Sequence, residues 1–177
     1  SSESRGLGDV YKRQIMPTYG RLPVTFASGA GAYLTDQKGR QYLDALSGIA
    51  VTNLGHSHPS VTRAVTEQAE SLLHTSNLYG IAQQERLAAE LNQLTGMERI
   101  FFCNSGAEAN ETAIKMARRH GHNKGIANPQ IVVFEGAFHG RTMGALSATG
   151  SAAIQAAFKP LLLSLIHISE PTRLTRI

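Results

Sequence analysis

The sequence lacks several features that mark particular classes of protein. It contains one cysteine, Cys103, so no disulfide can form within the chain, which indicates a reducing compartment such as the cytoplasm. It has no tryptophan, and aromatic residues make up only 6% of it. No apolar run approaches the roughly 18 residues that a membrane-spanning helix needs, and the first residues carry no apolar core of a secretory signal. We therefore expect a cytoplasmic protein with no membrane partner.

The formal net charge of +4 comes from scattered basic residues. These occur at most in pairs, such as Arg118 with Arg119, without the interleaved aromatic residues that are typical of nucleic-acid-binding surfaces. Hydrophobic residues make up 42% of the chain, which is enough for a packed core. The composition predicts a globular protein without a nucleic-acid partner.

The two ends of the chain differ from the sequence between them. Residues 9–14 can be encoded by GAT GTG TAT AAG AGA CAG, whose reverse complement translates to Leu-Ser-Leu-Ile-His-Ile, the sequence of residues 163–168. This inverted match resembles the transposon-end adapter used to prepare sequencing libraries. We predict that residues 1–14 and 163–177 are translated adapter and that the native segment is 15–162. Without the two tails the formal charge falls from +4 to +2.

The first part of the native segment predicts a small antiparallel meander followed by a helix. Short β-prone pieces at 24–26, 32–34 and 41–43 are separated by glycine-containing turns. Residues 46–59 are rich in Gly, Ser, Asn and His, which predicts an ordered loop. A helix is expected to begin at Pro59, because proline is favoured at the first helical position and apolar residues follow at helical spacing.

The second part predicts alternating helices and strands. We expect a helix at 83–94, a strand buried on both faces at 100–103, a helix at 107–120 and a buried strand at 131–134. Strand, helix and strand in this order indicate a βαβ unit, in which the strands are parallel. The predicted fold class is therefore α/β.

Asn104-Ser105-Gly106 joins the first of these strands directly to a helix. Free N–H groups and the positive dipole end of a helix bind anions, and glycine lets a ligand approach the backbone closely. The Gly-Lys-Ser/Thr of a nucleotide-binding loop is absent, which favours a phosphate monoester bound without Mg²⁺. The alternative is a plain capped helix, since Ser105 and Glu108 form a capping box and Glu111 can pair with Lys115.

Residues 138–142, Phe-His-Gly-Arg-Thr, follow the second strand. Ligands of α/β sheets bind beyond the carboxyl ends of the strands. Phe138 can stack on a flat heteroaromatic ring, and Arg141 can pair bidentately with a carboxylate. Either residue can instead be an ordinary core or surface side chain. No orienting carboxylate is evident for His139, which we expect to be structural or to adjoin a cofactor.

His56 and His58 lie two residues apart in a loop. Because no third ligand lies nearby in the sequence, we expect no metal site there. Loop hydrogen bonding before the helix that begins at Pro59 is the interpretation that we favour.

The segments NSGAEANETAIKMAR (104–118) and FHGRT (138–142) resemble those of class III, fold type I, pyridoxal-phosphate-dependent aminotransferases. LDALSGIAVTNLGHSHP and HTSNLY are similar to the family's upstream segments, and YGRLP with GIAV is similar to its acetylornithine branch. The resemblance covers the native segment. It implies a partial fold type I structure, with an amino-terminal, small-domain part at 15–58 and the first part of the cofactor-binding large domain at 59–162.

The resemblance implies a cofactor, pyridoxal 5'-phosphate, and the residues that bind it. Ser105, Gly106 and Ala107 would hold its phosphate, and Phe138 would stack on its pyridine ring. Glu108 and Asn110 would support the loop and helix. The substrate-binding residues would be Arg141, which would contact a carboxylate, and three residues that line the pocket or the dimer interface, Ile49, Asn77 and Tyr79.

The implied reaction is transamination of N-acetylornithine with 2-oxoglutarate, in arginine biosynthesis, by a homodimeric parent enzyme. The alternatives are ornithine, succinylornithine or 4-aminobutyrate aminotransferases, which share the framework, and a non-catalytic phosphate-binding α/β module. In the family, the Schiff-base lysine and the acidic partner of the pyridine nitrogen lie further downstream. The native lysines of this chain, Lys38, Lys115, Lys124 and Lys159, do not match that position. We expect the chain to hold no catalytic residue, to be inactive and to expose apolar surface that promotes aggregation.

Overall fold

A computed structural model of the chain describes residues 14–162 and 165–168. The chain forms two compact units, Ser1–Ile81 and Ala82–Ile177. The predicted adapter residues 1–13, 163–164 and 169–177 lie outside the described part of the chain. The origin of both tails, and the domain boundaries expected from the sequence, stay predictions.

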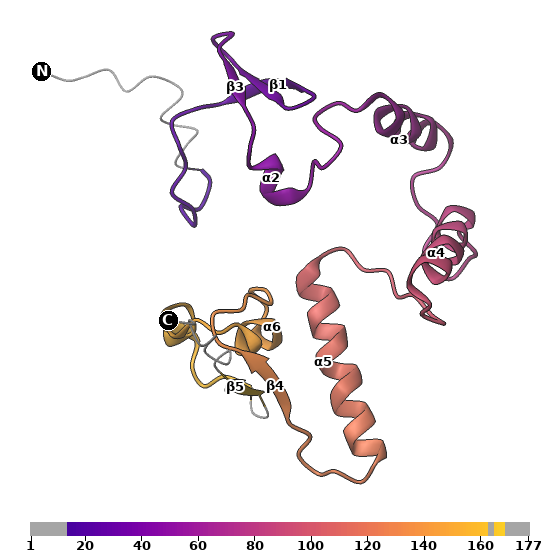
Figure 1. Ribbon diagram of the computed structural model, residues 1–177, viewed down its shortest axis with the longest axis vertical. Coiled ribbons are helices and arrows are strands. Elements are labelled where there is room, and N and C mark those ends of the chain that lie inside the picture. The colour runs from indigo at the N-terminus through magenta and orange to yellow at the C-terminus, as the bar shows by residue number, and fades with distance from the viewer. Residues whose placement is uncertain (1–13, 163–164, 169–177) are drawn as a thin grey trace, which may run out of the picture. The chain divides into compact units, whose positions relative to one another are not determined.

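The first unit contains a three-stranded antiparallel sheet in the order β1-β2-β3 (Figure 1). Gly31, in the turn between the first two strands, has a φ of 54°, and Gly39, in the next turn, has a φ of 78°. Glycine adopts this left-handed conformation without a steric penalty. The predicted meander is thereby confirmed, with strands at Phe26–Ala30 (β1), Tyr33–Asp36 (β2) and Gln41–Leu43 (β3). The first strand lies later than the predicted 24–26 and shares only Phe26 with it.

The loop predicted at 46–59 contains one short turn in a left-handed conformation, α2 (Ser47–Ala50). All four of its residues have φ between 51° and 63°, although only Gly48 is a glycine. Because this conformation costs other residues about 1–2 kcal/mol each, contacts from outside the turn must hold it. The Asp44 carboxylate supplies two of them, since its Oδ1 accepts hydrogen bonds from Leu46 N (3.1 Å) and Ser47 N (2.9 Å).

The helix α3 (Pro59–Ser71) begins at the proline, as the sequence predicts. None of its residues is buried, and Val61 and Val65 on its apolar side are 48% and 63% exposed. The helix therefore has its predicted start but lacks a packed face against the described part of the chain.

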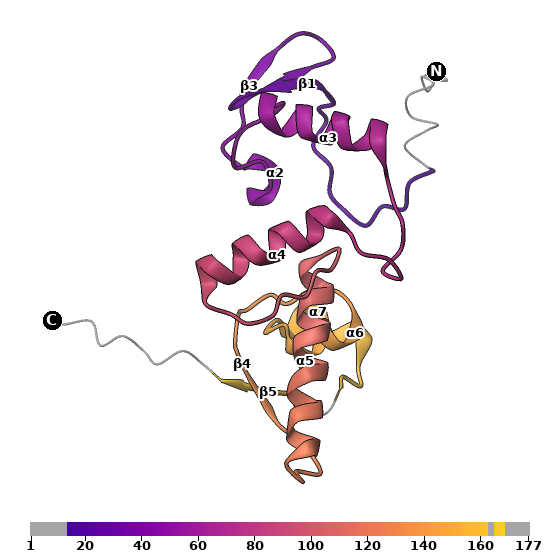
Figure 2. The same ribbon diagram turned by 90° about the vertical axis from the view of Figure 1, so that its right-hand side faces the viewer.

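The second unit confirms the predicted helices and one predicted strand. Its buried core surrounds α6, in which Gly144 to Ala148 are all buried, together with Val133 of β4 and Thr149. Both views show α6 beside the amino-terminal half of α5 (Figures 1 and 2). The elements are α4 (Ala82–Thr95), α5 (Gly106–Asn123), β4 (Ile131–Phe134), α6 (Met143–Ala148), α7 (Ala152–Gln155), the 3₁₀ helix η1 (Ala156–Phe158) and β5 (Leu165–Ile168).

The strand predicted at 100–103 is wrong, because these residues have no regular secondary structure and Phe101 is 67% exposed. A strand needs a neighbour for its backbone hydrogen bonds. The neighbour of β4 is instead β5, which pairs with it in parallel, with Ile131 opposite Leu165. The expected burial of β4 is also only partial, since Val133 is 7% exposed but Val132 is 58% exposed.

The strand β5 falls within 163–177, which the sequence predicts to be translated adapter. Pairing of Leu-Ile-His-Ile with β4 reflects its β-prone residues and says nothing about their origin. None of the helices in the described part of the chain is both long enough and apolar enough to cross a lipid bilayer.

Candidate functional site

The amino terminus of α5 is capped by Ser105 and Glu108, the two residues of the expected capping box. Ser105 has an extended backbone, and its Oγ accepts a hydrogen bond from Glu108 N at 3.2 Å. Glu108 Oε2 in turn accepts one from Asn104 N at 2.8 Å, one residue before the position that a capping box uses. Glu108 therefore supports the loop, as predicted, and its carboxylate is already engaged.

The cap leaves room for an anion at the start of α5. A Cβ built at Gly106 would have no atom within 4 Å, so the space around this backbone is open. The N–H groups of Gly106 and Ala107 precede the one that Ser105 caps, and a helix of 18 residues directs its positive dipole end at them. These N–H groups and the Ser105 hydroxyl fit a phosphate oxyanion.

The Phe138–Thr142 segment lies directly against α5. Asn110 Nδ2 donates to the carbonyl oxygen of His139 at 2.7 Å, which confirms the supporting role expected for Asn110. Gly140 has a φ of 132°, and a Cβ built there would lie 2.8 Å from the Cβ of Ala107. Only glycine fits this position. The structure therefore brings together the two motifs that the sequence singles out.

Glu111 makes the second link between α5 and this segment. Its Oε1 accepts hydrogen bonds from Thr142 Oγ1 (2.5 Å), Gly144 N (2.9 Å) and Ala145 N (3.1 Å). The bond from Thr142 is the largest influence on the carboxyl; with the two N–H groups it lowers the pKa of Glu111, although burial opposes the shift. The carboxylate of Glu111 thus caps α6. Its expected partner Lys115 contributes only a Coulombic attraction to this carboxylate.

The buried hydroxyl of Thr149 fixes the same segment from its other side. Thr149 is 1% exposed, and its Oγ1 accepts from His139 N at 3.0 Å. The hydroxyl can donate to Ala145 O at 3.0 Å or to Gly140 O at 3.3 Å. The backbone of His139 is therefore held at both its N–H and its carbonyl group, which agrees with the structural role expected for it.

Phe138 and Arg141 lie side by side on the second unit. The Arg141 Cζ is 5.7 Å from the centre of the Phe138 ring, within the range of a cation–π interaction. Phe138 is 62% exposed, so its ring remains accessible. An accessible aromatic face beside a guanidinium suits a ligand with both a flat ring and a carboxylate.

The other predicted substrate residues, Ile49, Asn77 and Tyr79, belong to the first unit. Ile49 lies on the left-handed turn α2 and is 80% exposed, and Tyr79 is 69% exposed. All three side chains are available for contacts, but their role in substrate binding stays a prediction.

Of the two histidines at 56 and 58, His56 takes part in loop hydrogen bonding as expected, whereas the buried Nδ1 of His58 has no hydrogen-bond partner within the described residues. His56 Nε2 lies 2.7 Å from Asp44 Oδ2, and the hydrogen bond from His56 lowers the pKa of Asp44. The backbone of His56 also pairs with Gly31. Among the described residues no group of three or more His, Cys, Asp or Glu side chains could hold a metal ion. Sequence spacing did not reveal Asp44, which lies 12 residues before His56.

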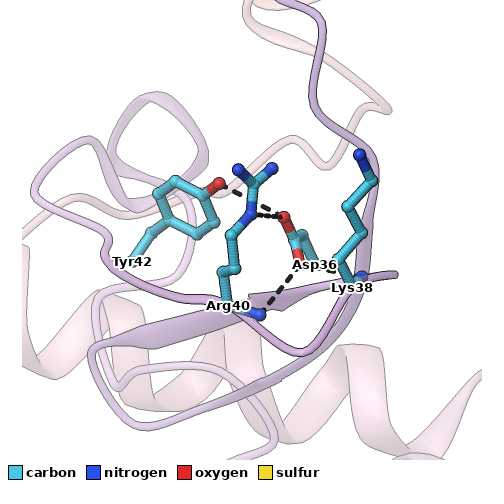
Figure 3. Close-up of polar contacts among 4 residues, drawn as sticks. All are labelled: Asp36, Lys38, Arg40 and Tyr42. Carbon is cyan, nitrogen blue, oxygen red and sulfur yellow. Dashed lines mark hydrogen bonds and ion pairs between the residues drawn. The ribbon is translucent and has the colours of Figure 1, made fainter.

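A second carboxylate cluster, also missed from the sequence, closes the turn between β2 and β3 (Figure 3). Asp36 accepts from Lys38 N (2.9 Å), Arg40 N (2.9 Å), Arg40 Nε (2.7 Å) and Tyr42 Oη (3.2 Å). Burial raises the pKa of Asp36, but the hydrogen bonds from Arg40, Lys38 and Tyr42 outweigh burial and lower the pKa to about 2. The cluster stabilises the meander.

Comparison with known proteins connects this geometry to a family. The acetylornithine aminotransferase of Nitrosomonas europaea is 57% identical over 154 residues, which are 87% of this chain and 39% of that protein. The acetylornithine aminotransferase of Gloeobacter violaceus is 48% identical over 159 residues, 89% of this chain and 40% of that protein. The chain thus spans about 40% of the length of these relatives.

Solved structures show the same fold. The ornithine aminotransferase from Toxoplasma gondii ME49 matches with a TM-score of 0.85 at 28% identity, over 92% of this chain and 39% of that one. The adenosylmethionine-8-amino-7-oxononanoate aminotransferase from Methanocaldococcus jannaschii matches with a TM-score of 0.85 at 32% identity, over 94% and 40%. The predicted fold, part of a fold type I transaminase, is confirmed.

The family model described as Aminotransferase class-III matches residues 15–176, which include both the phosphate-loop segment and the Phe138–Thr142 segment. The match also extends into 163–177, whose adapter origin remains a prediction. Since the match covers most of the sequence, the chain belongs to the class-III aminotransferases.

Proposed function

We propose that the chain carries the phosphate-binding half of a pyridoxal-phosphate site, and that the whole protein transfers the amino group of N-acetylornithine to 2-oxoglutarate. The observation that carries the proposal is the contact of Gly140 with Ala107, which joins an open helix amino terminus to an exposed Phe–Arg pair. The acetylornithine aminotransferases that are 57% and 48% identical to this chain support the substrate.

The residues present fit the cofactor. The N–H groups of Gly106 and Ala107 and the hydroxyl of Ser105 bind the phosphate, and the ring of Phe138 stacks on the pyridine ring. When bound, pyridoxal phosphate supplies the electron sink that amino-group transfer needs. Glu108 and Asn110 bind neither group, since their side chains are hydrogen-bonded to Asn104 and His139.

Arg141 binds the substrate through a carboxylate. A guanidinium presents paired N–H donors that match the two oxygens of a carboxylate. Its position 5.7 Å from the Phe138 ring supports binding of that carboxylate beside the cofactor ring. In the whole protein, a cytoplasmic homodimer in this proposal, Ile49, Asn77 and Tyr79 line the substrate pocket or the subunit interface.

The chain alone is inactive in this proposal, because none of its lysines corresponds to the one that attaches the cofactor. Lys115 lies within α5, and Lys124 follows it at the carboxyl-terminal cap. Borohydride reduction of the chain with pyridoxal phosphate, followed by peptide mapping, is expected to give no single labelled lysine. Stoichiometric labelling of one lysine would contradict this part of the proposal.

Ligand titration tests the phosphate site in the chain itself. Pyridoxal phosphate and inorganic phosphate are expected to shift the amide NMR signals of Gly106 and Ala107, and Ser105→Ala should weaken both effects. The control is Ser71→Ala at the exposed end of α3, which should leave them unchanged. Binding of ATP in preference to pyridoxal phosphate would favour the non-catalytic phosphate-binding module instead.

The substrate is tested in the complete protein. We expect kcat/KM to be higher with N-acetylornithine than with ornithine, succinylornithine or 4-aminobutyrate. Arg141→Ala should raise KM for the carboxylate substrate by about tenfold or more, the usual effect of losing a charge-assisted hydrogen bond. The matched control is Arg63→Ala on the exposed helix α3. A preference for ornithine would overturn the proposed donor.

A further inference from the structure

Glu111 is an acidic residue on one helix whose side chain caps the amino terminus of another helix. It lies on α5, yet its Oε1 accepts hydrogen bonds from Thr142 Oγ1, Gly144 N and Ala145 N, which open α6. The first N–H groups of a helix have no partner within that helix, so an acidic acceptor stabilises them. Because α6 has no side-chain cap of its own at Thr142, Glu111 performs this task from another element.

The close approach of Glu111 depends on a glycine. A Cβ built at Gly144 would lie 2.6 Å from Glu111 Oε1, a distance that no carboxylate tolerates. Glu111 and the backbone of Gly144 are therefore matched in shape as well as in hydrogen bonding. A methyl group at 144 should break the link without any change to α5, which gives an independent way to test it.

Asn110 and Glu111, consecutive residues of α5, hold the two sides of Arg141. Asn110 binds the carbonyl group of His139, before the arginine, and Glu111 binds the side chain of Thr142, after it. The same helix begins at Ser105 and Gly106, the proposed phosphate-binding residues. One rigid element thus carries both the phosphate end of the site and the anchors of the arginine.

We propose that Glu111 is a positioning residue, which fixes Phe138 and Arg141 at a set distance from the phosphate-binding end of α5. The inference rests on the proposed function. Glu111 contacts neither ligand and acts through Thr142 and the first turn of α6. An anion bound at the start of α5 should therefore also protect the 138–149 segment, because ordering of one end of a linked structure favours order at the other.

Hydrogen–deuterium exchange of the full 177-residue chain tests the inference. Inorganic phosphate is the probe because it has no ring that could stack on Phe138. Glu111→Ala and Gly144→Ala should each speed exchange of 138–149 by about tenfold or more, while residues 116–123 of α5 change little. Glu111→Gln keeps an acceptor oxygen and should retain most of the protection. Matched controls are Glu67→Ala on the exposed face of α3 and Gly20→Ala, where a Cβ meets nothing within 4 Å.

Phosphate should protect both 104–108 and 138–149 in the unmodified chain and in Glu111→Gln, but only 104–108 in Glu111→Ala. Unchanged exchange of 138–149 in Glu111→Ala overturns the inference, as does phosphate protection of that segment without Glu111. If Glu111→Ala unfolds α5 as well, Glu111→Gln decides, and its failure to restore the phosphate response counts against a positioning role. If phosphate does not protect 104–108 in the unmodified chain, the proposed phosphate site is wrong. The exchange rates of 138–149 measured without phosphate still test whether Glu111 keeps this segment in position.

Discussion

The two units hold their functional residues in place by different means. In the second unit, Asn110 and Glu111 bind groups about 30 residues further along the chain, around a core in which Ala145, Leu146 and Thr149 are at most 3% exposed. In the first unit, His56 binds Asp44 and Gly31 over a longer range, but the hydrogen bonds of Asp36 reach residues no more than six positions away, and α3 buries no residue. The Phe138–Thr142 segment therefore has tertiary support within this chain, whereas the turn that carries Ile49 depends on local bonds.

The largest expected difference concerns the buried core. Leu146 is 3% exposed, so Leu146→Ala should lower the free energy of unfolding of the second unit by about 2–5 kcal/mol. Leu73→Ala, at a site 83% exposed in the first unit, should change stability by no more than about 0.5 kcal/mol. Urea unfolding followed by far-ultraviolet circular dichroism measures both. Equal effects would remove the distinction between the units.

A smaller loss is expected when one buried polar contact is removed. Thr149→Val leaves the N–H of His139 without its acceptor in a buried setting, which should cost about 1–3 kcal/mol. Thr66→Val on the exposed helix α3 is the matched control and should be nearly neutral. Amide exchange at His139 gives a local measurement, and protection that survives the substitution would show that Thr149 is not the anchor.

Acidification should act on the first unit through Asp36. Its pKa is lowered to about 2, so its contribution to stability is present above the ordinary value of 3.8 and is lost as the pH falls through about 2. The NMR signals of the Lys38 and Arg40 amides should follow this titration, and Asp36→Asn should abolish it. Persistence of the transition in Asp36→Asn would assign it to another carboxyl group.

The smallest effect is expected at an exposed ion pair on α4. Arg86 Nε lies 3.1 Å from Glu90 Oε1, with the two side chains 76% and 57% exposed. Arg86→Ala should therefore change the free energy of unfolding by about 0.5 kcal/mol or less. Circular dichroism at low and high salt measures it. A loss above about 1 kcal/mol would show that α4 is supported by more than surface charge.

Local signals were enough to predict most elements from the sequence. Glycine turns located the meander, Pro59 marked the start of α3, and Ser105 marked the cap of α5, because each signal acts through neighbouring residues. The contacts that join α5 to the 138–149 segment could not be predicted in this way. Helical spacing assigns Lys115 to Glu111, whereas the actual partners of the carboxylate are donors on another helix.

The prediction of a strand at 100–103 was wrong for a similar reason. Its apolar residues are suited to a buried strand, but propensity does not supply the neighbour that completes backbone hydrogen bonding. Residues 165–168 pair with β4 because they provide such a partner, whatever their origin. The left-handed turn at Ser47–Ala50 was likewise missed, because only one of its residues is a glycine.

The packing of Gly140 on Ala107 has a genetic consequence. A Cβ at 140 would collide with Ala107 and also with Ala145, 2.9 Å away, at a backbone φ of 132° that already disfavours any side chain. A larger residue at 107 would press on the same space, so the effects of substitutions at the two positions should not add. The codons for residues 107 and 140 are thereby subject to one packing constraint. A substitution at one of these positions that is harmless when the other is unchanged becomes disruptive when the other also carries a larger residue.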